Sequence, residues 1–318
     1  MKFRTEVEIA ISKEKIGVED KLFSMGSCFA GELSALLSKG QLQTLNNPYG
    51  TLFNPFSINE ALKKLHKSEF YTEDDLIKYN DEIISLDHHS SFNSRFLHQT
   101  LEKINKSIEA GNQFLQSSKW VIITYGSSFI YEFLPKKKLV ANCHKIPAKH
   151  FEKRLLSQYE ISESISESIK ILKDICTDDV QILFTVSPVR HTRDGMTQNS
   201  LSKSKIITAL HDVIPQFENC QYVPVYEILM DDLRDYRYYK DDLIHPNSQA
   251  VAYIWEKFKD AFFSEETRGF VEENLKISKA LEHQTEDENS PKYQGFLASV
   301  QQRIIAQRAK VKHEIFKN

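Results

Sequence analysis

The stretch that decides the fold is Lys21-Leu22-Phe23-Ser24-Met25-Gly26-Ser27-Cys28-Phe29-Ala30, an apolar run that ends at a glycine and a serine. Comparable apolar runs occupy residues 42–45, 120–125, 180–186 and 222–226. Continuous apolar runs of this length are typical of strands that are buried on both faces. The last run is the weakest candidate, because Pro224 disfavours a central position in a sheet.

Between these runs, apolar residues recur at helical spacing. The predicted helices cover residues 32–39, 58–66, 99–118, 161–175, 201–214 and 247–262. Strands that alternate with helices favour βαβ units and a parallel sheet covered on both faces. We therefore expect a three-layer α/β/α sandwich with five mostly parallel strands.

Two regions fall outside this alternation. Residues 68–98 are polar and rich in histidine, and we interpret them as an excursion between the second and third strands. Residues 263–318 are highly charged and predict a helical extension, with a loop at 283–289 and a helix that begins at Ser290-Pro291 and runs to about Lys310. The expected division is an α/β domain over 1–262 and a charged helical extension over 263–318. That last helix packs one apolar face on the domain or serves as a surface for assembly.

The amino-acid composition excludes some classes of function for this protein. The chain has 318 residues, a formal net charge of −3 and four cysteines, which form no CxxC pair. No basic field favours nucleic acid, and no apolar run reaches the length of a membrane span or a signal peptide. Scattered cysteines fit a reducing compartment, so we expect a cytoplasmic protein that binds neither nucleic acid nor membrane.

Ser27 stands where a parallel sheet places its ligands, just after a strand and at the start of a helix. One interpretation is that Ser27 merely caps the helix. The other is that it is a nucleophile, since N–H groups at a helix N-terminus can stabilise an oxyanion. Asp242-Leu243-Ile244-His245 precedes the last strong helix and supplies what a hydroxyl nucleophile needs. His245 is the candidate base, Asp242 orients it, and Asp241 is the fallback for that carboxylate.

This ordering resembles the SGNH hydrolases, also called GDSL-like esterases. One branch is matched more closely, since Gly26–Ala30 reads GSCFA, the motif that names the GSCFA domain family. Further stretches of that pattern cover roughly residues 1–265 in the same order; they are residues 46–55, 124–127, 142–145, 187–191 and 194–195. The resemblance implies a flavodoxin-like SGNH fold and a serine esterase.

The resemblance also implies an oxyanion hole. Its donors would be the N–H groups of Ser27 and Gly50, completed by Ser127 or by Asn142. Two departures from the SGNH pattern stand out, because no Asp precedes Ser27 and no Asn follows Gly126. Ser127 is preferred to Asn142, since it lies where the pattern places the third donor.

Four other side chains are candidates for contacting substrate. His144, Arg190 and His191 follow or neighbour predicted strand ends, and His89 lies in the polar excursion. Each could equally support its loop. Cys28 invites a thiol nucleophile, although a small buried packing residue is the preferred interpretation. The histidines lack the spacing of a zinc site, so we expect no metal and no cofactor.

The expected function is hydrolysis of acyl esters through an acyl-enzyme, on a small-molecule or glycan substrate such as an O-acetylated carbohydrate. One alternative is binding or transfer of the acyl group on the same fold. Another is a non-enzymatic assembly protein that uses the C-terminal helix.

Overall fold

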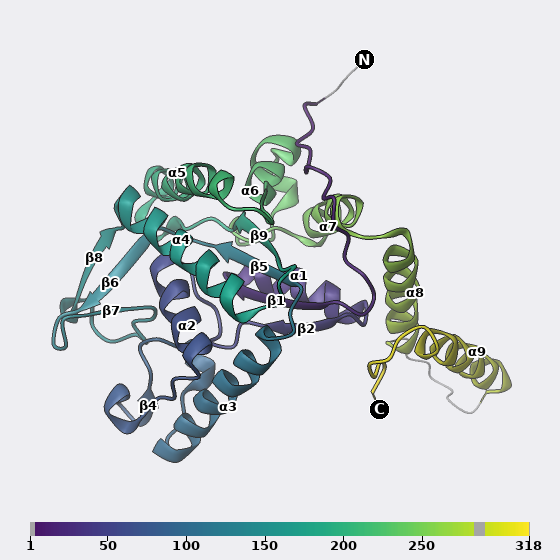
Figure 1. The fold of residues 1–318 in the computed structure, drawn as a ribbon, viewed down its shortest axis with the longest axis horizontal. Helices are drawn as coiled ribbons and strands as arrows, with labels where there is room; N and C mark the ends of the chain where they lie inside the picture. The colour runs from purple at the N-terminus through teal and green to yellow at the C-terminus, as the bar shows by residue number, and fades with distance from the viewer. Residues whose placement is uncertain (1–3, 283–289, 318) are drawn as a thin grey trace.

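The computed structural model describes residues 4–282 and 290–317, and Figure 1 shows the chain as a ribbon. At its centre lies a sheet whose five strands are all parallel. The strand order is β10-β9-β5-β1-β2, which is the flavodoxin-like order 5-4-3-1-2 in sequence terms. The strands are β1 (Lys21–Gly26), β2 (Gln43–Asn46), β5 (Trp120–Tyr125), β9 (Gln181–Val186) and β10 (Cys220–Val223). The predicted fold class is confirmed, and β10 ends just before Pro224.

Helices cover both faces of this sheet. One face packs against α2 (Pro55–Lys67), α3 (Leu97–Leu115), α4 (Gln158–Ile175) and α5 (Met196–Val213). The other face packs against α1 (Cys28–Lys39) and α7 (Ser248–Phe262). Strand residues alternate between the two cores, so that Val121 and Ile123 face the first and Trp120 and Ile122 face the second. Because both cores are apolar, these strands read as continuous apolar runs.

The sequence did not reveal two small antiparallel sheets. The polar excursion contains a hairpin of β3 (Ile77–Tyr79) and β4 (Glu82–Ile84). A three-stranded sheet follows β5, made of β6 (Phe129–Phe133), β7 (Lys138–Val140) and β8 (Phe151–Leu155) in the order β7-β6-β8. Figure 1 shows this second sheet projecting beyond the end of the central sheet. Its strands are short and carry charges at exposed positions, so they gave no continuous apolar signal.

The remaining elements are helical. A short α6 (Val225–Glu227) leads into a π-helix at Ile228–Leu233. Single turns of 3₁₀-helix lie at Glu73–Asp75, Ser90–Phe92, Ala148–His150, Thr192–Asp194, Ile214–Gln216 and Tyr236–Tyr238.

Two helices form the C-terminal extension. The sequence did not predict α8 (Glu265–Leu281), whose Asn274 donates from Nδ2 to the carbonyl of Gly40 at 3.0 Å and so joins it to α1. The predicted last helix is α9 (Pro291–Arg308), capped by Ser290. It packs on α8 through Ile277, Val300 and Ile304. The loop predicted at 283–289 lies outside the described residues. Within the described ranges, no helix has the length and apolar character needed to cross a bilayer.

Candidate functional site

Ser27 lies at the carboxyl end of β1, in a turn that only glycine permits. Gly26 has φ +140°, and a Cβ there would lie 2.1 Å from the carbonyl oxygen of Thr124. The Gly26 N–H donates to Asn47 Oδ1 at 2.7 Å, and the Ser27 N–H donates to the Thr124 carbonyl at 2.9 Å. These contacts hold the serine between the ends of β1 and β5, where the strand order reverses.

The hydroxyl of Ser27 does not cap α1. Ser27 occupies the N-cap position, yet its side chain makes no capping hydrogen bond. Its Oγ is buried and has no hydrogen-bond partner within the described residues. A buried hydroxyl without a partner costs free energy, and such groups require a structural explanation. This observation disfavours the interpretation of Ser27 as a helix cap.

A small cavity of about 50 Å³ lies against Ser27. The ends of β1, β5 and β9 and the loop after β2 contribute to it. The lining residues are Ser27, Cys28, Phe53, Gly126, Ser127, Ser187, Val189, Arg190 and His191. Ser27 itself is only 2% exposed, so its hydroxyl has little contact with bulk solvent. We call this space the serine cavity.

Phe53 forms part of that wall. A Cβ built on Gly126 would lie 2.9 Å from Phe53 Cδ1 and 3.3 Å from Ser27 Cβ, so Gly126 separates the ring from the serine narrowly. The Phe53 carbonyl accepts the N–H groups of Gly126 and Ser127 at 2.7 and 3.0 Å. Phe53 is 42% exposed and lines the serine cavity, so it lies between this cavity and solvent.

Asp242 and His245 form a hydrogen-bonded pair in the loop before α7. His245 Nδ1 lies 2.7 Å from Asp242 Oδ2. The backbone N–H groups of Ile244 and His245 donate to Asp242 Oδ1 and, with the imidazole, lower the pKa of this carboxyl to about 2. The Ile244 carbonyl accepts the N–H of Arg190 at 3.2 Å, which ties this loop to the serine cavity. No hydrogen bond joins His245 to Ser27 Oγ in the described structure.

The predicted oxyanion donors are differently placed. Ser127 lines the serine cavity, whereas Asn142 does not. Asn142 Oδ1 instead accepts the N–H of His144 at 2.9 Å. The N–H of Gly50 is used within its own turn, donating to the Asn47 carbonyl at 2.7 Å. The N–H groups of both Ser27 and Gly50 therefore have intramolecular acceptors here, and the first turn of α1 is the remaining backbone source of donors.

Of the four candidate substrate contacts, Arg190 and His191 line the serine cavity. His191 Nε2 lies 2.9 Å from Asp194 Oδ2, and Lys153 also pairs with that carboxylate. These two partners lower the pKa of Asp194. His191–Asp194 is thus a second imidazole–carboxylate pair beside Ser27.

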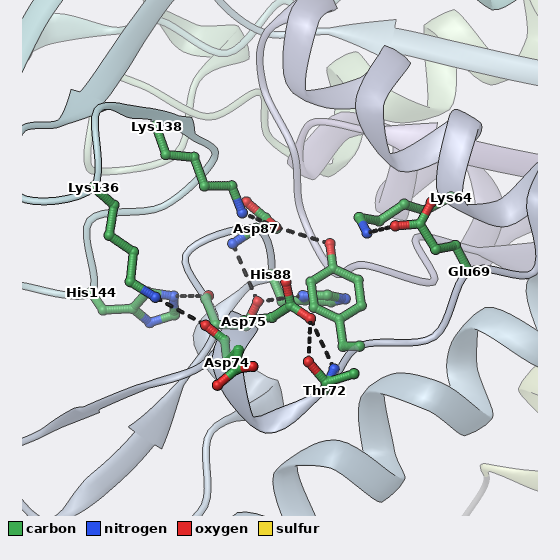
Figure 2. A network of polar contacts seen from close by, with 12 residues as sticks. Lys64, Glu69, Thr72, Asp74, Asp75, Asp87, His88, Lys136, Lys138 and His144 are labelled. Carbon is green, nitrogen blue, oxygen red and sulfur yellow. Dashed lines mark hydrogen bonds and ion pairs between the residues drawn. The ribbon is translucent and has the colours of Figure 1, made fainter.

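The other two candidates lie in the polar excursion and the loop after β7. His144 Nε2 contacts the Ser85 carbonyl at 2.7 Å, and this contact belongs to the polar network that Figure 2 shows. His89 Nδ1 contacts Ser91 Oγ at 3.1 Å. Neither histidine lines the serine cavity. Both contacts hold the excursion together.

A larger cavity, of about 610 Å³, lies between α2, the β3–β4 hairpin and the turn between β6 and β7. Part of its charged rim makes contacts within the rim, as Figure 2 shows: Lys138 contacts Asp87 at 2.7 Å, and Lys136 donates to the Asp74 carbonyl at 3.0 Å. Tyr71 also donates to Asp87, at 3.0 Å. Size alone makes this the default binding site, but the unpartnered hydroxyl of Ser27 favours the smaller cavity.

The sequence assigned no role to two residues at or next to this site: Phe53, which lines the cavity, and Lys203, which contacts the lining residue Ser187. Phe53 lies in the stretch 46–55 of the family pattern, where no function was predicted for it. Lys203 lies on the predicted helix at 201–214. Lys203 is fully buried, donates from Nζ to the Ser187 carbonyl at 2.6 Å and has its pKa lowered by burial to about 7. Its place on the buried face of an amphipathic helix was the available signal.

Cys28 was expected to be buried, and the structure corrects this. Its side chain is exposed at the edge of the serine cavity, because the first residue of α1 turns outward. Partial desolvation raises the pKa of its thiol. A raised pKa disfavours the thiolate that a cysteine nucleophile needs.

No curated protein matches the chain. A solved structure of a DUF4886 family protein from Bacteroides uniformis ATCC 8492 aligns with a TM-score of 0.40 and 10% identity, covering 92% of this chain and 100% of that one. The GSCFA family matches residues 21–258, which include Ser27, Asp242 and His245. The chain belongs to the GSCFA family.

Proposed function

We propose that this protein is a serine esterase of SGNH type, with Ser27 as nucleophile and His245 and Asp242 as base and orienting carboxylate. The observation that carries the proposal is the Ser27 hydroxyl, which is buried, free of the helix cap and unpartnered beside a cavity. The Asp242–His245 contact supports it, since it leaves His245 Nε2 as the acceptor for a hydroxyl proton.

The reaction has two halves. Ser27 Oγ attacks the carbonyl carbon of the ester while His245 Nε2 takes the hydroxyl proton. The carbon–oxygen bond to the alcohol then breaks, and His245 returns the proton to the leaving alkoxide. Water attacks the acyl-enzyme in the second half, again giving a proton to His245, and the acid leaves as the Ser27 hydroxyl re-forms. The donors that we propose for the oxyanion are the backbone N–H groups in the first turn of α1, with the hydroxyl of Ser127, which would exchange its contact with Ser202 for the substrate.

The dimensions of the serine cavity favour a small acyl group. A volume of about 50 Å³ holds only a few non-hydrogen atoms. An acetyl group is of that size, and O-acetylated carbohydrates are the substrates that we propose. A cytoplasmic location is part of the proposal, supported by four cysteines that form no disulfide.

Labelling with a fluorophosphonate probe tests the nucleophile. We expect stoichiometric modification of Ser27, identified by mass spectrometry of the peptide, and none in Ser27→Ala. In Cys28→Ala the adduct should remain on residue 27. Absence of an adduct on the wild-type serine would overturn the proposal.

Two histidine variants test the base. His245→Asn should abolish labelling, whereas His191→Asn should retain it. Loss in His191→Asn with retention in His245→Asn would instead assign the base to the His191–Asp194 pair.

A second candidate function is acyl transfer, because the same acyl-enzyme can pass its acyl group to an alcohol in place of water. Product analysis with an added acceptor alcohol distinguishes the two. Acylated alcohol in excess of free acid indicates a transferase.

A further inference from the structure

Arg190 is a cation at the serine cavity that forms no ion pair with any residue of the described ranges. Its guanidinium carbon lies 4.1 Å from the ring centroid of Tyr239 and 4.9 Å from that of Tyr236. Its Nε is buried and has no hydrogen-bond partner in the described structure. Two carboxylates of the neighbouring loops are paired elsewhere, Asp235 with Arg237 and Asp242 with His245.

The position of Arg190 connects two spaces. It lines the serine cavity of about 50 Å³, and it also lines an open cleft of about 450 Å³ whose walls include Tyr226, Tyr236 and Tyr239. Its backbone N–H is held by the Ile244 carbonyl, next to His245. A substrate whose acyl group occupies the serine cavity would therefore extend its alcohol portion past Arg190 into the cleft.

The chemistry of the guanidinium indicates what that portion carries. Arginine presents a planar set of donors that matches the two oxygens of a carboxylate, and stacking on aromatic rings fixes its orientation before a ligand binds. A buried donor without a partner is costly unless a ligand supplies the acceptor. Asp231, Arg234 and Asp235 also border the cleft. The two carboxylates outnumber this one further cation, so the charges around Arg190 disfavour a dianion such as a phosphate monoester relative to a carboxylate.

We propose that Arg190 binds a carboxylate on the alcohol portion of the ester, so that the substrate is a small acyl ester of a carboxylated alcohol. This inference rests on the proposed esterase for its substrate geometry. The binding of the carboxylate itself does not require turnover.

A matched pair of esters tests specificity: phenyl acetate and 3-carboxyphenyl acetate differ only in the carboxylate. The wild-type protein should favour the carboxylated ester by about tenfold or more in kcat/KM, as expected for a charged hydrogen bond. Arg190→Met should bring the ratio of the two kcat/KM values close to one, and Arg190→Lys should retain part of the preference. Arg193→Met removes an exposed arginine three residues away and should leave the ratio unchanged. A wild-type ratio near one would overturn the proposal.

Direct binding separates this inference from the esterase. Calorimetry with 3-hydroxybenzoate should show binding to wild type and to Ser27→Ala, and at least tenfold weaker binding to Arg190→Met. If binding follows this pattern and no ester is hydrolysed, the Arg190 site is supported and the esterase proposal is overturned. If phenyl acetate is hydrolysed but 3-hydroxybenzoate binds equally to wild type and to Arg190→Met, the proposed carboxylate site at Arg190 is overturned and the esterase proposal is not. Tighter binding of 3-hydroxyphenyl phosphate than of 3-hydroxybenzoate would overturn the choice of a carboxylate.

Discussion

His245 is held by Asp242 through both its ring and its backbone: Nδ1 lies 2.7 Å from Oδ2, and the backbone N–H lies 2.9 Å from Oδ1. The ring contact assigns the proton to Nδ1, which leaves Nε2 to accept one. Because one carboxylate makes both contacts, the orientation of the imidazole depends on Asp242 more than on packing, since both side chains are partly exposed.

Asp242→Asn should therefore reduce the rate of ester hydrolysis by roughly 10³- to 10⁴-fold, because an amide can favour the wrong tautomer of His245. Steady-state hydrolysis of an aryl acetate measures the effect. Asp241→Asn is the matched control, since Asp241 is the adjacent exposed carboxylate. A loss in Asp241→Asn with an unchanged rate in Asp242→Asn would mean that the register of the pair is wrong.

Phe53→Ala should increase the rate at which a fluorophosphonate labels Ser27, because the Phe53 ring stands between the serine cavity and solvent. The labelling rate is measured at several probe concentrations, so that a change in access of the probe to Ser27 can be distinguished from a change in the reactivity of the serine. Phe96→Ala truncates an exposed phenylalanine elsewhere and should leave the labelling rate unaltered. A slower reaction in Phe53→Ala would show that the ring positions the probe instead of excluding it.

Gly26→Ala should destabilise the protein by at least about 3 kcal/mol, since it combines an unfavourable positive φ with a clash against backbone. The added Cβ would lie 2.1 Å from the Thr124 carbonyl oxygen, which belongs to the central sheet and cannot move freely. Urea unfolding measures the change. Gly269→Ala, at an exposed helical position with nothing within 4 Å, should instead stabilise by roughly 0.5–1 kcal/mol. A Gly26→Ala protein as stable as wild type would contradict the geometry of this turn.

Lys203 should make stability depend on pH. Burial lowers its pKa from 10.5 to about 7, so between these values the unfolded chain binds more protons than the folded one. Stability therefore rises with pH across that window, while below about pH 7 the full cost of burying the charge is present. Lys203→Met should flatten the slope of Tm between pH 7 and 10 relative to wild type. Parallel slopes in the two proteins would show that other groups carry the dependence.

The elements with strong periodicity could be predicted from the sequence. The strand at 120–125 and the helix at 161–175 were predicted correctly. The strand buries side chains in both cores, and the helix buries one face in the first core. The strands β6, β7 and β8 could not, since short strands at the periphery alternate weakly and carry Lys and Glu. The helix α8 was missed because its apolar residues, such as Val271 and Ile277, are few among many charges.

The candidate site divides in the same way. Residues close in sequence, such as Asp242 and His245, could be paired from their spacing, because a loop three residues long brings both side chains together. Which distant residues meet Ser27 depended on how the strand ends converge. Arg190 and His191 reach the serine cavity from the loop after β9 and Phe53 from the loop after β2, whereas His144, His89 and Asn142 make contacts within the excursion and the loop after β7.

By itself, the sequence determined the alternation of the five central strands with their helices, the family, and the local turn that presents Ser27, since all of these are written in short stretches of neighbouring residues. Only the tertiary structure decided that the Ser27 hydroxyl is buried beside a small cavity, that Arg190 lies there with no counter-ion among the described residues, and that Gly50 uses its N–H within its own turn. The reason is physical: burial and hydrogen-bond satisfaction are properties of the whole packed chain, and no local pattern of residues specifies them.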